Sequence, residues 1–545
     1  MITATRQESL LLLALQPVVA LLIVLYFRSI ARWRARTCGR PLPPGPKRLP
    51  IVGNLFNMPR SKQWLGYRDL SHELGDVLYL KVLGQPIVVL GSAEAIFEYL
   101  DKRSANTSDR VQSPMIELSG SSLSLGFMPY GQWWRRHRRA FWQYFHRDAV
   151  EQYQPTQQSV THIFLETLLN NPSHLKQLIR FNFASGILKL VYDIDVEDEN
   201  DVFVKISEEA LKGAVEGLVP GKFLVEFLPF LRHVPPWFPG ATSQRLWAKW
   251  MAAGDRLKNV PFEHTKAKLE NGEATRSITE KLLSRMARWG TVSSEDEEII
   301  KNVGAVAFEA GTDTVLSTLL GMFSGVSLQP EVLRKAHAEL DAVVGPHRLP
   351  DFGDRDSLVY VNAIIKESMR WHSALPVGLS HANVSDDEFR GYFIPAGTVL
   401  IPNTWACMND PEVYKDPDVF RPERFIRDGR LDTSARDPAA FVFGYGRRHV
   451  VPQHPYFHAY EAHVISRICP GRYFAEATLF INVACVLHVF DIGPPLGEDG
   501  RPIKIEHVQT DTLVSYPEDC RCTIKPRSAM AESLIRSCAA AARSD

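Results

Sequence analysis

The chain has 545 residues, of which 45% are hydrophobic and 10% aromatic, so it can bury a large core. Lys and Arg together number 62, as do Asp and Glu, and this zero net charge argues against general nucleic-acid binding. The seven cysteines are odd in number and form no CxxC pair, which is typical of a reducing compartment without a disulfide framework.

The N-terminal segment predicts a membrane anchor. Residues 10–27 are almost uncharged and apolar, and the run is about long enough to span a bilayer. Arginines are frequent after this run, whereas only Arg6 precedes it. The positive-inside rule then predicts a lumenal N-terminus (1–9), a transmembrane anchor (10–27) and a body on the cytosolic side of the membrane. A cleaved signal peptide is the alternative, which the basic residues after the run disfavour. Residues 28–48 are basic and proline-rich and predict a connector.

Residues 49–525 predict one mainly helical domain with small β-sheets. Short β-branched runs at about 49–100 and 375–405 indicate strands. Helical patterns dominate 130–340 and return after Gly471.

Two further segments have an unusual composition. The stretch 223–240 is apolar, aromatic and interrupted by prolines, so it cannot be one helix. It is either a buried irregular segment or a second membrane contact. The Ala- and Ser-rich tail, 526–545, is predicted to be flexible.

Residues 294–325 predict a long central helix that begins with a capping box of Ser294 and Glu297. At its centre, two small residues are followed by a carboxylate and a hydroxyl: Ala310, Gly311, Asp313 and Thr314. Such a pattern lets a flat ligand approach the helix beside polar groups, and a mid-helix Thr can also bond back to a carbonyl. Ordinary helix packing around a glycine is the alternative.

The helical segment 360–372 places Glu367 and Arg370 on one face. Arg424, in a proline-rich stretch, could complete a buried charge network with them, which would lock the fold. The alternative is two unrelated surface pairs, which contribute little.

Two further segments could hold a charged ligand. The basic segment 130–141 contains Trp134 and Arg138, which could bind an anionic group, with a solvated helix face as the alternative. Cys469 precedes an apolar helix, and a cysteine at a helix N-terminus has a favoured thiolate that makes a good metal ligand. A small buried thiol is the alternative.

Taken in order, these motifs resemble those of the cytochrome P-450 monooxygenases. The motifs are PLPPGP, YGQWWRRHR, AGTDT, ESMR, FRPERF and FGYGRR…ICPG. The resemblance covers nearly the whole chain, and the segment NTWACMNDPEVYKDPDVFRPERF is similar to the sequences of fungal microsomal members. It implies a mainly α cytochrome P-450 fold with small sheets around haem b, preceded by a transmembrane helix. It also implies NADPH-cytochrome reductase as electron donor, O2 as co-substrate and an apolar small-molecule substrate, such as a secondary metabolite or xenobiotic.

The resemblance also implies roles for single residues. Cys469 would be the axial ligand of the haem iron, and Asp313 and Thr314 would be catalytic residues that manage proton delivery. The other haem-binding positions would be Trp134, Arg138, Ala310, Gly311, His381, Phe443, Gly444, Gly446, Arg448, Arg467 and Gly471. The structural lock would be Glu367, Arg370 and Arg424. Substrate contacts would come from about 104–125, 205–245, 300–314 and 375–382.

Residues 449–467 interrupt the haem loop of this family. Without them the chain reads FGYGRRICPGR, which fits the family pattern at every position, whereas with them Arg448 and Arg467 compete for one propionate contact. Three interpretations are open. The insertion loops out at modest entropic cost, although it would then obstruct reductase docking; its four histidines bind a metal; or it is a retained intron.

The sequence therefore predicts a haem-dependent monooxygenase that oxidises an apolar small molecule with O2 and reductase-supplied electrons. One alternative is a haem-thiolate isomerase or dehydratase, which Asp313 and Thr314 disfavour because oxygen activation is what needs them. The other is a haem-free or inactive product, such as a binding protein, because the insertion splits the haem loop.

Overall fold

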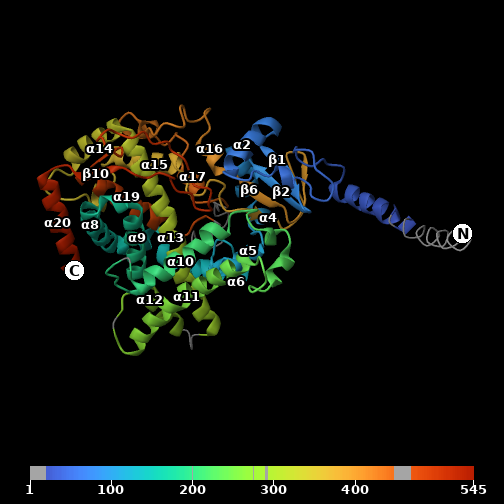
Figure 1. The fold of residues 1–545 in the computed structure, drawn as a ribbon, viewed down its shortest axis with the longest axis horizontal. Helices are drawn as coiled ribbons and strands as arrows, with labels where there is room; N and C mark the ends of the chain where they lie inside the picture. The colour runs from blue at the N-terminus through green and yellow to red at the C-terminus, as the bar shows by residue number, and fades with distance from the viewer. Residues whose placement is uncertain are drawn as a thin grey trace, which may run out of the picture.

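The structure, a computed structural model, describes residues 20–21, 23–198, 200–273, 275–288, 293–446 and 468–544. Figure 1 shows a mainly helical body, with a small sheet on the side from which the N-terminal helical segment projects. The C-terminal helix lies at the opposite end of the body. The predicted class, mainly α with small β-sheets, is therefore confirmed.

Helices of ten residues or more make up most of the body. They are α2 (Gln63–Leu74), α6 (Gln132–Phe145), α8 (Gln154–Asn170), α9 (Leu175–Tyr192), α10 (Val202–Gly217), α11 (Thr242–Glu270), α12 (Ile278–Ala287), α13 (Ser294–Leu328), α14 (Pro330–Val343), α15 (Val359–Trp371), α19 (Arg472–Val489) and α20 (Ala529–Ser544). The shorter helices are α3 (Ala93–Ile96), α4 (Ser104–Thr107), α5 (Pro114–Leu118), α7 (Arg147–Val150), α16 (Thr404–Met408) and α17 (Ala439–Val442).

The main sheet joins the two distant stretches that were predicted to form strands. Its order is β1 (Val77–Val82), β2 (Gln85–Leu90), β6 (Val399–Pro402) and β3 (His381–Ala382). The hairpin between β1 and β2 turns at Leu83 and Gly84, whose φ values are 47° and 96°. β6 runs parallel to β2 and pairs Ile87 with Val399. Among the described residues, three two-stranded sheets complete the β structure: β4 (Asp387–Phe389) with β5 (Tyr392–Ile394), β7 (Ile426–Arg427) with β8 (Arg430–Leu431), and β9 (Phe490–Gly493) with β10 (Thr523–Pro526).

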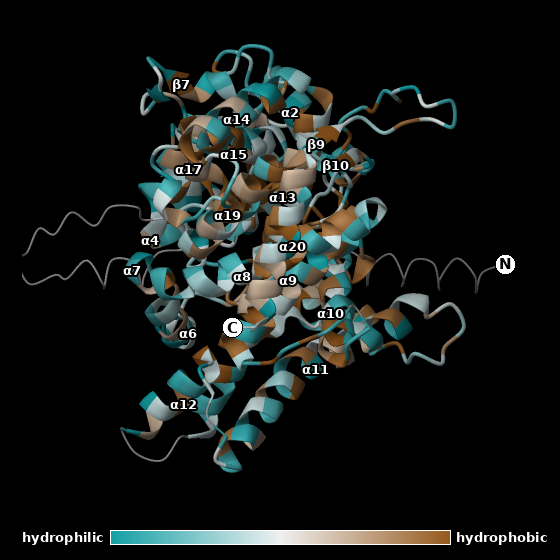
Figure 2. Ribbon diagram, turned by 90° about the vertical axis from the view of Figure 1, so that its left-hand side faces the viewer, coloured by the Kyte–Doolittle hydropathy of each residue, from teal (hydrophilic) through white to brown (hydrophobic). Residues whose placement is uncertain are grey.

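Helix α13 runs through the centre of the body. It packs against α9, α15 and α19 and is buried on most sides, as expected for a helix that is apolar all round. In Figure 2 the central helices α13 and α19 are mainly brown to white, whereas α6 is largely teal. The core is therefore organised around α13, and the polar residues lie on the outer helices.

The N-terminus of α13 differs from the prediction by one residue. The Ser293 hydroxyl accepts a hydrogen bond from the Asp296 amide at 3.2 Å, and the Asp296 carboxylate accepts one in return from the Ser293 amide. The capping box is thus Ser293 and Asp296, not Ser294 and Glu297. Glu297 is instead engaged by Lys301, one turn further along, at 3.0 Å.

The predicted anchor, 10–27, lies largely outside the described residues, as does the predicted lumenal segment before it. Within the part of the chain that the structure describes, no helix is both long enough and apolar enough to cross a membrane. The described residues 23–37 are helical, so the predicted connector, 28–48, begins as a helix. Arg36, near the end of this helical segment, pairs with Asp386 at 2.5 Å and ties the segment to the body.

The apolar stretch 223–240 forms no single helix, as predicted. It contains two short 3-10 turns, η6 (Leu224–Glu226) and η7 (Pro229–His233). Its most exposed large side chains are 51–79% exposed: Leu224, Phe230, Trp237 and Phe238. Although Val225 is buried, this exposure contradicts the interpretation of the whole stretch as a buried segment.

The C-terminal tail was predicted to be flexible, but most of it forms α20, which packs against α8. Ile535 and Ala539 on α20 are fully buried. Alanine has the highest helix propensity of the natural residues, and a buried apolar face stabilises a helix that is otherwise marginal. The alanine-rich composition therefore signals a docked helix here and not a frayed end.

Candidate active site

A cavity of about 280 Å³ lies beside the middle of α13 and brings together most of the predicted site. The predicted site residues in its wall are Trp134, Arg138, Ala310, Gly311, Asp313, Thr314, His381, Phe443, Gly444, Cys469 and Gly471. Gly446 does not line the cavity, and Arg448 and Arg467 lie outside the described residues. Segments far apart in the sequence thus meet at one chamber.

The centre of α13 presents small and polar residues to this cavity. The Thr314 hydroxyl donates to the Ala310 carbonyl at 2.8 Å, which is the back-bond expected of a mid-helix threonine. Thr312, between Gly311 and Asp313, is fully buried and is not in the cavity wall. A Cβ added to Gly311 would lie 3.5 Å from Ile187 of α9, an ordinary contact distance.

The Asp313 carboxylate is buried, and it forms an ion pair with an arginine that is partly exposed to solvent. Its carboxylate accepts a hydrogen bond from Arg180 Nε of α9 at 3.3 Å. The Asp313 side chain is 3% exposed and that of Arg180 is 25% exposed. Burial raises the pKa of the nearby Tyr516, and the negative charge of Asp313 adds to this rise. Asp313 therefore connects the cavity wall to a partly solvated arginine.

The two halves of the predicted haem loop meet in the structure. The Cys469 amide, which follows the insertion in the chain, donates to the Phe443 carbonyl, which precedes it, at 2.8 Å. Gly444 and Gly446 have φ values of 86° and 131°, a region that favours glycine because it has no Cβ. The Gly446 amide donates to the Asp101 carboxylate at 2.6 Å. The Phe443 half is therefore held both to the Cys469 half and to the main body.

Cys469 lies just before α19, with Gly471 as the N-cap of that helix. Burial raises the pKa of the Cys469 thiol, whereas a hydrogen bond from the Gly471 amide and the positive charge of Arg138 lower it in part. Burial outweighs these two effects, so the thiol favours its neutral form. A metal ion at the sulfur would reverse that preference, because a coordinating thiol is deprotonated outright.

Polar groups from three other elements surround the cavity. Trp134 Nε1 of α6 donates to the Leu125 carbonyl at 3.2 Å, and His381 of β3 hydrogen-bonds the Thr107 carbonyl through Nδ1 at 2.8 Å. Arg110 was not predicted from the sequence. Its Nη1 donates to the carbonyls of residues 379 and 380 at 2.8 Å each, while its Nε is buried without a hydrogen-bond partner among the described residues. A buried guanidinium with an open donor indicates a site for an anionic ligand.

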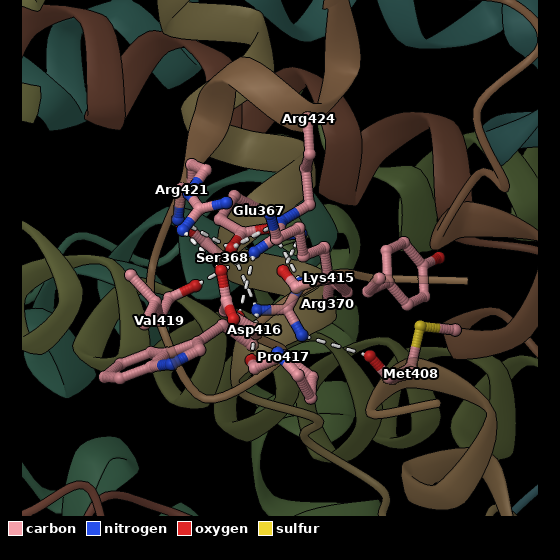
Figure 3. Close-up of polar contacts among 12 residues, drawn as sticks. Glu367, Ser368, Arg370, Met408, Lys415, Asp416, Pro417, Val419, Arg421 and Arg424 are labelled. Carbon is pink, nitrogen blue, oxygen red and sulfur yellow. Dashed lines mark hydrogen bonds and ion pairs between the residues drawn. The ribbon is translucent and has the colours of Figure 1, made fainter. Parts of the chain in front are cut away.

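The predicted charge network exists behind this site and is shown in Figure 3. Arg370 donates from Nε and Nη2 to the two oxygens of Glu367, at 2.7 and 2.8 Å, and both side chains are 0% exposed. Arg424 joins them at 3.1 Å from Glu367. The other donors of the two arginines are taken by backbone carbonyls, which are those of Met408, Lys415, Asp416, Pro417 and Val419. The alternative of two unrelated surface pairs is thereby excluded.

A second buried polar cluster follows α15. His372 Nε2 lies 3.1 Å from the Ser317 hydroxyl of α13 and 3.2 Å from the Ser515 carbonyl. Its Nδ1 lies 3.5 Å from Nε2 of His507, whose ring stacks on Trp371 with centroids 3.6 Å apart. Burial lowers the pKa of His372 to about 4, so this histidine is neutral in the folded protein.

The predicted substrate-contact segments all reach the cavity wall. The wall residues from these segments include Ser124, Leu125, Leu211, Ala214, Val306, Ala307, Gly378 and Leu379. Sequence reasoning missed Phe141 and Phe145 of α6, Ile187 of α9 and the C-terminal pair Leu513 and Val514. These residues carry no motif and reach the cavity only through the packing of the helices. Among the described residues, no group of His, Cys, Asp or Glu could hold a free metal ion, and the histidines of the insertion lie outside them.

Comparison with known proteins gives a consistent result. A model of the family Cytochrome P450 matches residues 43–449 of the chain. Cytochrome P450 monooxygenase COX2 of Coprinopsis cinerea is 38% identical over 502 residues, covering 92% of this chain and 92% of that protein. Cytochrome P450 monooxygenase COX1 of the same fungus is 36% identical over 523 residues, with 94% and 97% covered. Tryptamine 4-monooxygenase of Psilocybe cyanescens is 34% identical over 493 residues, with 89% and 93% covered.

Proposed function

Because this chain belongs to the cytochrome P450 family of monooxygenases, we propose that Cys469 is the axial ligand of its haem b and that the cavity holds an apolar small molecule. The observation that carries the proposal is the hydrogen bond from the Cys469 amide to the Phe443 carbonyl at 2.8 Å. The Cys469 thiol and the small residues Ala310 and Gly311 of α13 line the same cavity, which supports this role.

The residues present fit a haem. Arg110 has a buried Nε without a partner among the described residues, and it shares the cavity with Arg138, Trp134 and His381. Arg110 and Arg138 supply donors for the two propionates, in the directional way that guanidinium groups bind carboxylates. The indole N–H of Trp134 already donates to the Leu125 carbonyl, so this side chain lines the wall beside them. Cys469 would bind the iron, and thiolate ligation favours cleavage of the O–O bond. Glu367, Arg370 and Arg424 would hold the fold beneath this group.

The chain offers a route from solvent for the protons that oxygen reduction consumes. Thr314 presents its hydroxyl at the cavity wall, with the proton directed to the Ala310 carbonyl. Asp313 is a buried carboxylate in contact with Arg180, which is partly solvated. Release of Asp313 from Arg180 lets the carboxylate carry a proton from the solvent side toward Thr314. Reduction of O2 consumes protons at every turnover, whereas isomerisation and dehydration consume none overall, so a proton route from the solvent side supports a monooxygenase.

The substrate and the partners follow from the surroundings of the site. The cavity wall is mainly apolar, which suits a secondary metabolite or a xenobiotic of low polarity. NADPH-cytochrome reductase supplies the electrons. The exposed apolar side chains of 223–240 and the apolar run at 10–27 support an attachment to the endoplasmic reticulum membrane, with the catalytic body on the cytosolic side.

The insertion 449–467 decides whether the chain as written can bind haem. The family match ends at 449, where the insertion begins, and the residues on either side of it, Phe443 and Cys469, still bond to each other. We therefore propose that the loop forms despite the insertion, or on its removal if it is a retained intron.

The test is the carbon-monoxide difference spectrum of the reduced protein, for the full chain, the chain lacking 449–467, and Cys469→Ser in each. A red-shifted thiolate band is expected in at least one cysteine-containing form and in neither serine variant. A band in the shortened form alone would show that the insertion prevents haem binding and that the full chain is an inactive product. If neither cysteine-containing form binds haem, the haem-free binding protein replaces the proposal. A band that persists in Cys469→Ser contradicts the ligand assignment.

A further inference from the structure

One carboxylate in the mainly apolar cavity has no part in the function proposed above. Glu309 lines the cavity on the same side of α13 as Val306 and Asp313, three residues before it and four after it. Asp313 has Arg180 as a partner, but no lysine, arginine or histidine among the described residues forms an ion pair with Glu309. A charged or acidic group is costly in such a wall unless something satisfies it.

The hydrogen bonds of Glu309 are incomplete. Its Oε1 accepts a hydrogen bond from the Ser121 hydroxyl at 3.2 Å, while its Oε2 is buried and has no partner among the described residues. Burial raises the pKa of Glu309 to about 7, and hydrogen bonds from Ser124 and Ser121 lower it in part. The ionised carboxylate keeps Oε2 available as a hydrogen-bond acceptor. The Ser121 hydroxyl thus holds one carboxyl oxygen and leaves the other for a ligand.

We propose that Glu309 is a specificity-determining residue that accepts a hydrogen bond from a hydroxyl group of the substrate. The inference rests on the proposed monooxygenase function, because it assigns a substrate class to the same cavity. The preferred substrate is then an apolar molecule that already carries a hydroxyl, such as a terpenoid alcohol. It follows that the reaction which supplies this substrate installs or unmasks an alcohol.

A hydroxyl fits this position better than a cation does. The wall around Glu309 is mainly apolar, and an ammonium ion would lose far more hydration there than a hydroxyl would. A buried polar group that is built to receive a hydroxyl also rejects ligands without one, because it is left unpaired. Glu309 would therefore select alcohols over the corresponding ethers, which accept hydrogen bonds but cannot donate them.

The test measures dissociation constants by equilibrium dialysis with the haem-loaded protein, in the form that gives the thiolate spectrum. The probes are borneol and farnesol, each paired with its methyl ether. The variants are Glu309→Met, which has a similar volume and no acceptor oxygen, and Glu309→Gln, which keeps one. The matched control is Glu298→Gln on the same helix, whose carboxylate is 40% exposed and bonds Lys258 at 3.1 Å.

The wild type and Glu298→Gln should bind at least one alcohol about tenfold more tightly than its ether. Glu309→Met should reduce this ratio to within about twofold, and Glu309→Gln should give an intermediate value. Equal binding of alcohol and ether by the wild type, or no binding of either alcohol, overturns the inference. A preference that survives in Glu309→Met also overturns it, because the methyl group is then excluded by size alone. If Glu309→Met does not fold, Glu309→Gln decides by the same ratio. Failure of the proposed function would instead be seen as the missing thiolate spectrum.

Discussion

The ion pairs of Glu367 and Asp313 contain the same chemical groups in different surroundings. Glu367 and Arg370 are both 0% exposed and share two hydrogen bonds of 2.7 and 2.8 Å. Asp313 and Arg180 share one bond of 3.3 Å, and the arginine is 25% exposed. Opening the first pair would leave two buried charges unpaired, whereas opening the second would return the partly exposed Arg180 to water. One pair is suited to hold the fold, and the other is suited to open during turnover.

The largest effect is expected from Glu367→Ala. The change leaves Arg370 and Arg424 buried without a counter-charge, and breaking a buried pair in this way costs about 3–5 kcal/mol of stability. Chemical denaturation of the haem-loaded protein, followed by circular dichroism, measures the loss. The control is Glu331→Ala, whose pair with Arg334 is 71% and 67% exposed and whose removal should change stability by less than about 0.5 kcal/mol. Equal denaturation midpoints for the two variants would show that the network is not a lock.

The second expectation concerns the pH dependence of the region around α15. Burial lowers the pKa of His372 to about 4, while the unfolded chain protonates this residue near its ordinary value of 6.5. The unfolded state therefore binds a proton first as the pH falls, and stability is lost between about pH 6.5 and 4, by at most on the order of 3 kcal/mol. In His372→Gln the thermal midpoint should fall less between pH 6.5 and 5. His507, whose pKa is also lowered by burial, keeps the remaining slope. Parallel profiles for wild type and variant would contradict this assignment.

For the Asp313 pair, the expected effect is on rate and not on stability. Asp313→Asn keeps the shape of the side chain but cannot carry a proton, so product formation should fall about 100-fold, at the low end for a general acid–base group. The measurement is product and peroxide per NADPH oxidised, with the reductase and any compound that the wild type oxidises. The denaturation midpoint should stay close to that of the wild type. A normal rate in Asp313→Asn would remove this residue from the proton route.

The smallest effect is expected from Arg180→Lys. The lysine keeps the positive charge but replaces the directional guanidinium with a compact ammonium. The free energy needed to separate the pair should therefore change. Product formation should change by less than about tenfold, with a shifted pH profile. Lys189→Met on the same helix removes an exposed pair with Asp193 and should leave the profile unchanged. Identical profiles for all three proteins would mean that Arg180 only packs against Asp313.

The sequence predicted best what depends on local chemistry. Thr314 bonds back to Ala310, and Glu367 meets Arg370 three residues away, because helix geometry alone brings such residues together. The order of the motifs, through the family resemblance, also predicted that Cys469 and Asp313 belong to one site, and both line the same cavity. These contacts need little knowledge of the three-dimensional arrangement.

What the sequence did not predict depends on packing between distant elements. Arg110 and Glu309 belong to no motif that was recognised, and each gains its significance from buried atoms that lack a partner. Arg180 has no sequence signal, because it becomes relevant only where α9 crosses α13. The composition of the tail predicted flexibility. This prediction failed because the docking surface of the tail on α8 lies more than 350 residues earlier in the chain. Composition alone cannot show that such a surface exists.

The parallel pairing of β2 with β6 has a consequence for how this protein is made. Ile87 cannot pair with Val399 until a further 312 residues have left the ribosome, since 399 minus 87 is 312. At ordinary rates of synthesis this delay lasts roughly 15 to 60 s. During that time the apolar β1–β2 hairpin has an unpaired edge, which is a typical site of aggregation. The nascent chain should therefore depend on chaperones early in its synthesis, and slower translation should lower the yield of folded protein.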